Sequence, residues 1–202
     1  MRSQRSTTFQ HAKAAVAHGA GSRIRLIAFR ITTFVIVFEL AAGSVWNLLP
    51  IEWTEIQLRH LGYPQFLLHI LGVWQAGAAV AIIAPGLPVI KEWAYAGALF
   101  LWSGAVASHL IVGDGLRTWG VPLIFGMCAI ASWALRPADR WLRRGDLAST
   151  GQGRAAPSET RPRAWVVPIG LLVALYAVSF LTLPAAEAMT HQWAVELGWI
   201  NG

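Results

Sequence analysis

A few polar side chains lie inside long apolar stretches of this sequence, and they are its main candidates for chemistry. Glu39 lies in a run of apolar residues over about 26–48, Gln75 and His69 lie in a second run, and His109 lies in a third. Placing an ionisable side chain in hydrocarbon costs about 3 kcal/mol or more, so such residues usually have a function. Each of them is therefore a candidate for binding a ligand or transferring a proton.

The depth of each polar residue in the membrane can be predicted by counting a helical rise of 1.5 Å per residue from the outer end of its run. This count places the polar residues at two depths. The residues near the middle of the membrane are Glu39, Gln75 and Ser103. The residues within about 6 Å of one face are Asn47, His69 and His109. Whether they converge on one cavity depends on the rotation of each helix, which the sequence leaves open.

The spacing of the polar and small residues suggests which helix faces pack together. Glu39, Gly43 and Asn47 follow at intervals of four, so they share one face of a helix. Gly72 would let a neighbouring backbone approach, and Gly104 with Ser108 forms a small-residue pair suited to close helix contact.

Each candidate also has an alternative interpretation. Glu39 is either a protonated carboxyl hydrogen-bonded to Gln75, which would link two helices, or a group that handles protons. His69 and His109 either reach water and lipid headgroups or bind a ligand. Two histidines on different helices could also ligate a haem axially.

The composition indicates an all-α membrane protein. Hydrophobic residues make up 55% of the chain and charged residues only 13%, whereas soluble domains carry about 25% charged residues. Five apolar runs are long enough to cross a bilayer as helices, at about 26–48, 65–84, 93–112, 119–135 and 165–186. Short loops join the first four runs, which predicts a four-helix transmembrane core with an appended fifth transmembrane helix.

The remaining segments define the predicted organisation of the chain. Residues 1–22 are basic and expected to be disordered, 23–136 form the core, 137–164 are an Arg-rich linker, and 165–202 are the fifth helix and a short tail. Glu52 and Glu55 are expected in a solvated loop.

The positive residues predict the orientation. Fourteen of the sixteen Lys and Arg residues lie on the N-terminal side of the membrane, and only Arg59 and Arg117 lie on the other. By the positive-inside rule the N-terminus is cytoplasmic, in a bacterial-type cytoplasmic (inner) membrane that the chain crosses several times. The net charge of +6 is concentrated beside the predicted spans, which favours contact with anionic lipid over nucleic acid.

Sequence motifs of soluble enzymes are not found. There is no zinc-ligand spacing, phosphate-binding loop, dinucleotide fingerprint or nucleophile elbow, so no metal site and no catalytic residue is predicted. The single cysteine, Cys128, lies in an apolar run and cannot form an intrachain disulfide.

Residues 61–114 resemble the DoxX-like family of small membrane proteins. The resemblance rests on Leu-Gly-Tyr-Pro at 61–64, Ala-Pro-Gly at 84–86, Lys-Glu-Trp-Ala-Tyr-Ala-Gly at 91–97, Ser108-His109, and Gly113-Asp114. It implies a four-helix membrane bundle. Some members of this family are subunits of quinone-linked oxidoreductases that act on sulfur compounds, and others belong to oxidative-stress complexes. The resemblance therefore implies a possible redox role for this chain. Related sequences often carry Lys where this chain has Gln75.

Two functions are expected on this basis. The first is a redox-associated membrane subunit with a quinone pocket in the outer half of the bundle. His109, His69 and Ser108 would bind the head group beside Gln75, and Glu39 would manage a proton. The alternative is a non-enzymatic membrane scaffold or assembly partner of another complex, which would dock its partner through the fifth helix and the linker. The partner is either another membrane protein or a second copy of this chain. By the resemblance, the Lys91-Glu92-Trp93 elbow is a second site candidate or a structural hinge. A small-solute transporter is a weaker third candidate.

Overall fold

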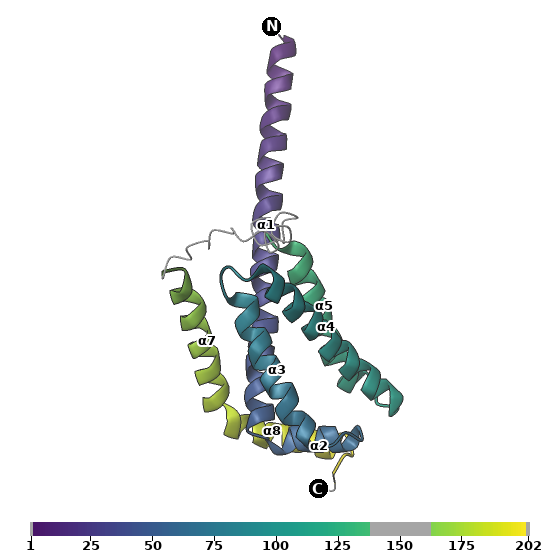
Figure 1. Ribbon diagram of the computed structural model, residues 1–202. Coiled ribbons are helices and arrows are strands. Elements are labelled where there is room, and N and C mark those ends of the chain that lie inside the picture. Colours follow the sequence, from purple (N-terminus) through teal and green to yellow (C-terminus); the bar gives the residue numbers. More distant parts are fainter. Residues whose placement is uncertain (1, 138–162, 201–202) are drawn as a thin grey trace.

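The computed structural model describes the backbone of residues 2–137 and 163–200, and the side chains of 21–137 and 163–200. Throughout the described residues the secondary structure is helical (Figure 1). The helices are α1 (Arg2–Leu48), α2 (Glu52–His60), α3 (Phe66–Ile83), α4 (Pro88–Ile111), α5 (Leu116–Leu135), α7 (Arg163–Leu181) and α8 (Leu183–Glu196).

Five of these helices are long and apolar enough to cross a membrane: Gly21–Leu48 of α1, and all of α3, α4, α5 and α7. The predictions of an all-helical membrane protein and of five spans are therefore confirmed. Many large apolar side chains on these helices point outward, Ile111 and Val167 among them, as expected of surfaces covered by lipid rather than water.

The longest helix, α1, lies at the centre of the bundle and contacts α3, α5 and α7. Helix α4 packs between α3 and α5. The two short helices α2 and α8 contact each other and lie across one end of the bundle, near the C-terminus (Figure 1). We call this end the α2–α8 end. The N-terminal part of α1 extends away from the opposite end (Figure 1).

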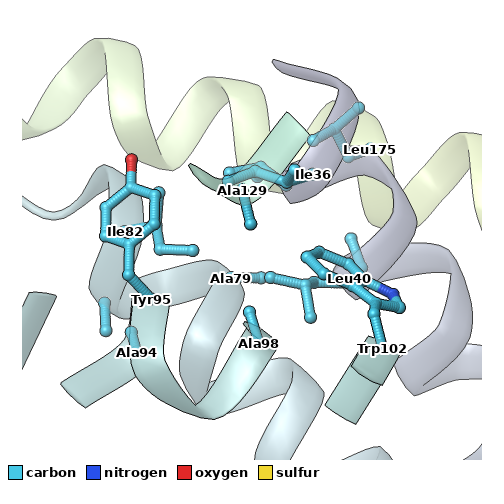
Figure 2. Close-up of a cluster of buried hydrophobic side chains, with 13 residues drawn as sticks. Ile36, Leu40, Ala79, Ile82, Ala94, Tyr95, Ala98, Trp102, Ala129 and Leu175 are labelled. Atoms are coloured by element: carbon cyan, nitrogen blue, oxygen red, sulfur yellow. The ribbon is translucent and has the colours of Figure 1, made fainter. Parts of the chain in front are cut away.

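The buried core joins α1 to the helices around it. Figure 2 shows Ile36 and Leu40 of α1 among side chains from the neighbouring helices, including Trp102 of α4. Three alanines in this cluster, Ala79, Ala98 and Ala129, are almost fully buried. Small residues let helix backbones approach closely, which is the main source of packing energy between helices in lipid.

The helix ends differ from the predicted ones. Helix α4 begins at Pro88 rather than near residue 93. Proline is favoured in the first turn of a helix, because the backbone N–H groups there have no partner within the helix and proline lacks that N–H. The fifth apolar run breaks at Thr182 into α7 and α8, with Pro184 in the first turn of α8. Helix α1 begins at Arg2, so residues 2–22 are helical where disorder was predicted; alanines at 12, 14, 15 and 17 favour a helix there. Most of the predicted linker, residues 138–162, lies outside the described residues.

Helix α2 was not predicted. The segment with Glu52 and Glu55 was expected to be a solvated loop, but it forms a helix that buries Thr54, Ile56 and Leu58. Both carboxylates lie in its first turn, where they complement the helix dipole. The helix is too short to be recognised from hydrophobic periodicity.

The Lys-Glu-Trp-Ala-Tyr-Ala-Gly segment holds helix ends together at the opposite end of the bundle. The ammonium group of Lys91 is buried and donates to the carbonyl oxygens of Ile82 (2.7 Å) and Ala84 at the end of α3. Glu92 lies 2.7 Å from the guanidinium group of Arg136 and accepts a 2.7 Å hydrogen bond from the indole of Trp133. These contacts favour the interpretation of the elbow as a structural hinge.

Candidate functional site

A cluster of polar side chains joins α2, α4 and the α4–α5 loop at the α2–α8 end. The carboxylate of Asp114 lies 2.6 Å from Nδ1 of His109 and 2.9 Å from Nε2 of His60. His109 is almost completely buried, whereas the side chain of His60 is 26% exposed. We call His60, His109 and Asp114 the histidine–aspartate cluster.

Hydrogen-bonding rules assign the protons in this cluster. An ionised carboxylate can only accept, so His109 Nδ1 and His60 Nε2 are the donors. In neutral His109, Nε2 then accepts from Nε2 of Gln57, 3.2 Å away. Burial would raise the pKa of Asp114, but the hydrogen bonds from His109 and His60 and the electrostatic attraction of the two imidazoles outweigh it and lower the pKa below its ordinary value.

The C-terminal segment covers this cluster. The indole of Trp199 stacks nearly parallel to the rings of His60 and His109, with ring centres 4.6 Å and 6.0 Å away. The same indole stacks on Trp53 of α2 at 5.1 Å. In α8, His191 lies 2.8 Å from Glu52 of α2. The end of the chain is thus anchored to α2 and to the cluster.

Ser108, the neighbour of His109, belongs to a more exposed contact. Its hydroxyl is 2.9 Å from that of Tyr63 and donates to the carbonyl oxygen of Gly104. Gly104 has no atom within 4 Å of where a Cβ would lie. The predicted close helix contact at Gly104 and Ser108 is therefore not formed in the described structure.

Between two of the transmembrane helices, Asn47 of α1 pairs with Gln75 of α3. Nδ2 of Asn47 donates to Oε1 of Gln75 at 2.7 Å, and both side chains are buried. The two residues were predicted at different depths, which is wrong. The depth count assumed that every apolar run starts in one plane, whereas packing shifts α1 along α3.

Glu39 does not make the predicted bond to Gln75. Glu39 is partly buried one turn before Gly43, and Gln75 accepts a hydrogen bond from Asn47 instead. Ser103 is exposed and bonds only to the carbonyl oxygen of Phe100 in its own helix. Glu39, Gln75 and Ser103, which were predicted to lie together near the middle of the membrane, therefore do not form one group.

A groove of about 770 Å³ runs between α3 and α4. Its walls are apolar or aromatic, with Gln75 as the one amide side chain, and its lining includes Leu40, Trp74, Ala81, Trp93 and Gly97. The lining spans residues 71–81 of α3 and 89–101 of α4, so the groove extends from mid-bundle away from the α2–α8 end.

The predicted site residues are thus divided. Gln75 lines the groove, whereas His109 and Ser108 lie at the α2–α8 end. His69 is exposed and, like Glu39, is not part of the groove lining. The described side chains include no group of three or more His, Cys, Asp or Glu residues that could hold a metal ion.

Sequence reasoning missed His60, Gln57 and Trp199. His60 and Gln57 are three residues apart, the spacing of one helix face, but they lie in the helix that was taken for a loop. No signal in the sequence indicated that Trp199, so near the C-terminus, would stack on His60.

The spans, the polar cluster at one end and the lipid-facing groove together define a multi-pass helical membrane protein. The chain belongs to the DoxX-like family, whose model matches residues 31–132. The match runs from the middle of α1 to near the end of α5 and does not include α7 or α8. Searches of curated proteins and of solved structures found no match.

Proposed function

We propose that this protein is a redox-associated membrane subunit that binds a quinone-type lipid in the groove between α3 and α4. The groove itself carries the proposal. Ligand sites for small molecules usually have volumes of about 300–1,000 Å³ and mostly apolar walls with a few polar groups. A groove of about 770 Å³ with one amide on its wall fits this description.

The surroundings of the groove favour a ligand that arrives through the membrane. Val73, Trp74, Ile90 and Trp93 line the groove and are also exposed on the surface of transmembrane helices. A lipophilic molecule could therefore enter sideways from lipid without crossing water. The indoles of Trp74 and Trp93 offer flat faces against which a quinone ring could stack.

In this proposal the head group binds to Gln75 rather than to the histidines, because Gln75 lines the groove. Both ring nitrogens of His109 already have partners, Asp114 and Gln57. His69 lies outside the groove lining. Glu39, one turn from Gly43, stays our candidate for proton exchange. In this proposal α1, α3, α4 and α5 form the core, and α7 is the appended helix.

Quinone extraction and titration test this proposal. The full chain, purified in mild detergent, is extracted for bound quinone and titrated with a short-tailed benzoquinone by calorimetry. Gln75→Leu, which removes the amide, should weaken binding about tenfold. Gly97→Leu, which fills open space in the groove, should abolish binding. His69→Ala serves as the control outside the groove. Absence of quinone binding, or equal binding by all variants, would reject the proposal.

A second candidate is a membrane scaffold, and the loose packing of α7 supports it. Only Leu175 and Ser179 of this helix are buried, while Val166, Val167 and Val173 are strongly exposed. Another protein's helix could cover this face. Photo-crosslinking from Val167 and Val173 in native membranes would then capture one defined protein, whereas labelling of lipid alone would count against a scaffold.

A further inference from the structure

We infer that α8 binds the membrane surface as an interfacial helix, with Met189 and Trp193 inserted among the lipids and His191 facing water. The partner of this helix is the bilayer at the α2–α8 end, and its contact with lipid holds Trp199 over the histidine–aspartate cluster. This role of α8 does not depend on whether the groove between α3 and α4 binds a quinone.

Helix α8 lies at the level where the spans end. The last span, α7, ends at Leu181, and α8 begins two residues later at Leu183. Helix α8 lies across the end of the bundle, whereas the spans run along it (Figure 1). With 14 residues it is too short to cross the hydrocarbon itself, which takes about 20. A bilayer around the spans therefore has its headgroups beside α8.

Two opposite sides of α8 differ in their chemistry. Met189 and Trp193 are four residues apart, so they lie on one side of the helix, and both are about half exposed. His191 is two residues from each of them, and two residues turn a helix by about 200°, so it points the other way. Glu187, one turn before His191, is exposed on that second side. The apolar side ends at Glu196, the last residue of α8, which is also exposed.

The contact with α2 determines which side of α8 faces water. Nδ1 of His191 lies 2.8 Å from Oε2 of Glu52, and both side chains are about half exposed. Arg59, two turns further on the same side of α2, is exposed as well. An ionised side chain in hydrocarbon costs about 3 kcal/mol, so this edge of the helix pair faces water. The opposite side of α8, with Met189 and Trp193, therefore faces lipid.

The side chains of α8 favour insertion among lipids rather than attraction to charged headgroups. Indole rings prefer the membrane–water boundary, and interfacial helices bury an apolar side there. Helix α8 carries Glu187 and Glu196 and has no Lys or Arg. Attraction to anionic lipid therefore contributes nothing, and a bilayer of zwitterionic phospholipid is sufficient.

The lipid contact of α8 is connected to the histidine–aspartate cluster by the turn that follows the helix. Gly198 has a φ of 72°, a conformation that favours glycine, and the N–H of Trp199 donates to the carbonyl oxygen of Ala194 at 2.9 Å. The indole of Trp199 then stacks on His60 with ring centres 4.6 Å apart. Because this turn directly follows α8, lipid that holds the helix also holds the indole over the cluster.

Spin labels at two positions of α8 test the inference. The full-length Cys128→Ala protein, in phosphatidylcholine nanodiscs, carries one nitroxide at Met189→Cys or at His191→Cys. Accessibility is measured to oxygen, which concentrates in lipid, and to a water-soluble nickel complex. Val173→Cys, exposed on a span, gives the reference ratio for lipid, and Arg59→Cys gives that for water. Position 189 should match the lipid reference and position 191 the water reference, with or without added phosphatidylglycerol.

Two results of this measurement would overturn the inference. Nickel accessibility at 189 equal to that at 191 would show that α8 lies in water beyond the headgroups. Low accessibility of 189 to both reagents would show that protein, such as a second copy of this chain, covers the apolar side.

A charge placed on either side of α8 tests whether lipid holds Trp199 in place. Met189→Asp should raise amide hydrogen exchange over residues 183–199 in nanodiscs about tenfold, because a carboxylate is expelled from lipid. Gln192→Asp puts the same charge at an exposed polar position of this helix and should change exchange little. Equal exchange in the two variants would show that lipid does not hold α8 and Trp199.

Discussion

Nδ1 of His109 lies 2.6 Å from Oδ2 of Asp114, and this contact ties the last turn of α4 to the loop that follows it. His60 of α2 reaches the other oxygen of the same carboxylate at 2.9 Å. One acidic side chain therefore joins two helices that are separated in the sequence by α3.

Replacing Asp114 should destabilise the protein in a pH-dependent way. The pKa of Asp114 is lowered in the folded state, so its carboxylate contributes stability above its ordinary value of 3.8, and this contribution is lost as the pH falls through the lower folded value. Asp114→Asn should cost about 1–3 kcal/mol near neutral pH. Thermal unfolding in detergent at several pH values measures it. The difference between variant and wild type should shrink in strong acid, and a difference independent of pH would contradict the assignment.

Trp199 should control the docking of α8. Its indole stacks on His60 and Trp53, and such aromatic pairs contribute about 0.5–1.5 kcal/mol each. Trp199→Ala should therefore raise amide hydrogen exchange over residues 183–196, while Trp199→Phe should raise it less. Phe100→Ala, at an exposed aromatic residue on α4, is the control. Equal exchange in Trp199→Ala and wild type would mean that α8 is held without Trp199.

Gly72 should be required for the packing of α1 against α3. A Cβ there would lie 2.7 Å from Cγ of Leu48 and 3.2 Å from its backbone nitrogen. Gly72→Ala should cost about 1–3 kcal/mol, because the two helices must move apart. Gly104→Ala is the matched control, since it meets no atom within 4 Å and gains helix propensity. Both are compared by thermal unfolding, and similar melting temperatures would contradict the close contact.

Glu92 should matter more for stability than other acidic residues. It pairs at 2.7 Å with Arg136, whose side chain is only 1% exposed. Breaking a buried ion pair by removing one partner costs about 3–5 kcal/mol. Glu92→Ala should therefore lower the melting temperature strongly, whereas Glu187→Ala, at an exposed position on α8, should not. Equal effects of the two substitutions would show that this pair contributes little.

The orientation in the membrane can be tested by cysteine labelling. With the N-terminus inside, Arg59→Cys in α2 should react with a membrane-impermeant maleimide in intact cells. Arg163→Cys, at the start of α7, should react only after permeabilisation. Both positions are exposed, so accessibility within the protein is matched. The reverse labelling pattern would invert the predicted topology.

The sequence by itself determined the class of protein and its spans. Whether a segment enters a bilayer depends on the hydropathy of about 20 contiguous residues, which is a local property that can be read directly. The sequence also predicted the turn at Pro85 and Gly86, which ends α3. This turn too is a local property, because Gly86 has a φ of 76°, a backbone conformation that favours glycine. The close approach at Gly72 was also predicted from its size alone.

The tertiary structure decided which polar residues meet. Gln75 pairs with Asn47 rather than Glu39, and His109 meets His60 and Asp114 rather than His69. These partners depend on how far each helix is shifted and rotated against its neighbours, which is set by packing over many residues at once. Trp199 is the clearest case. Its position over the histidine–aspartate cluster results from the break at Thr182 and the path of α8 along α2, contacts between distant parts of the chain that no local pattern encodes.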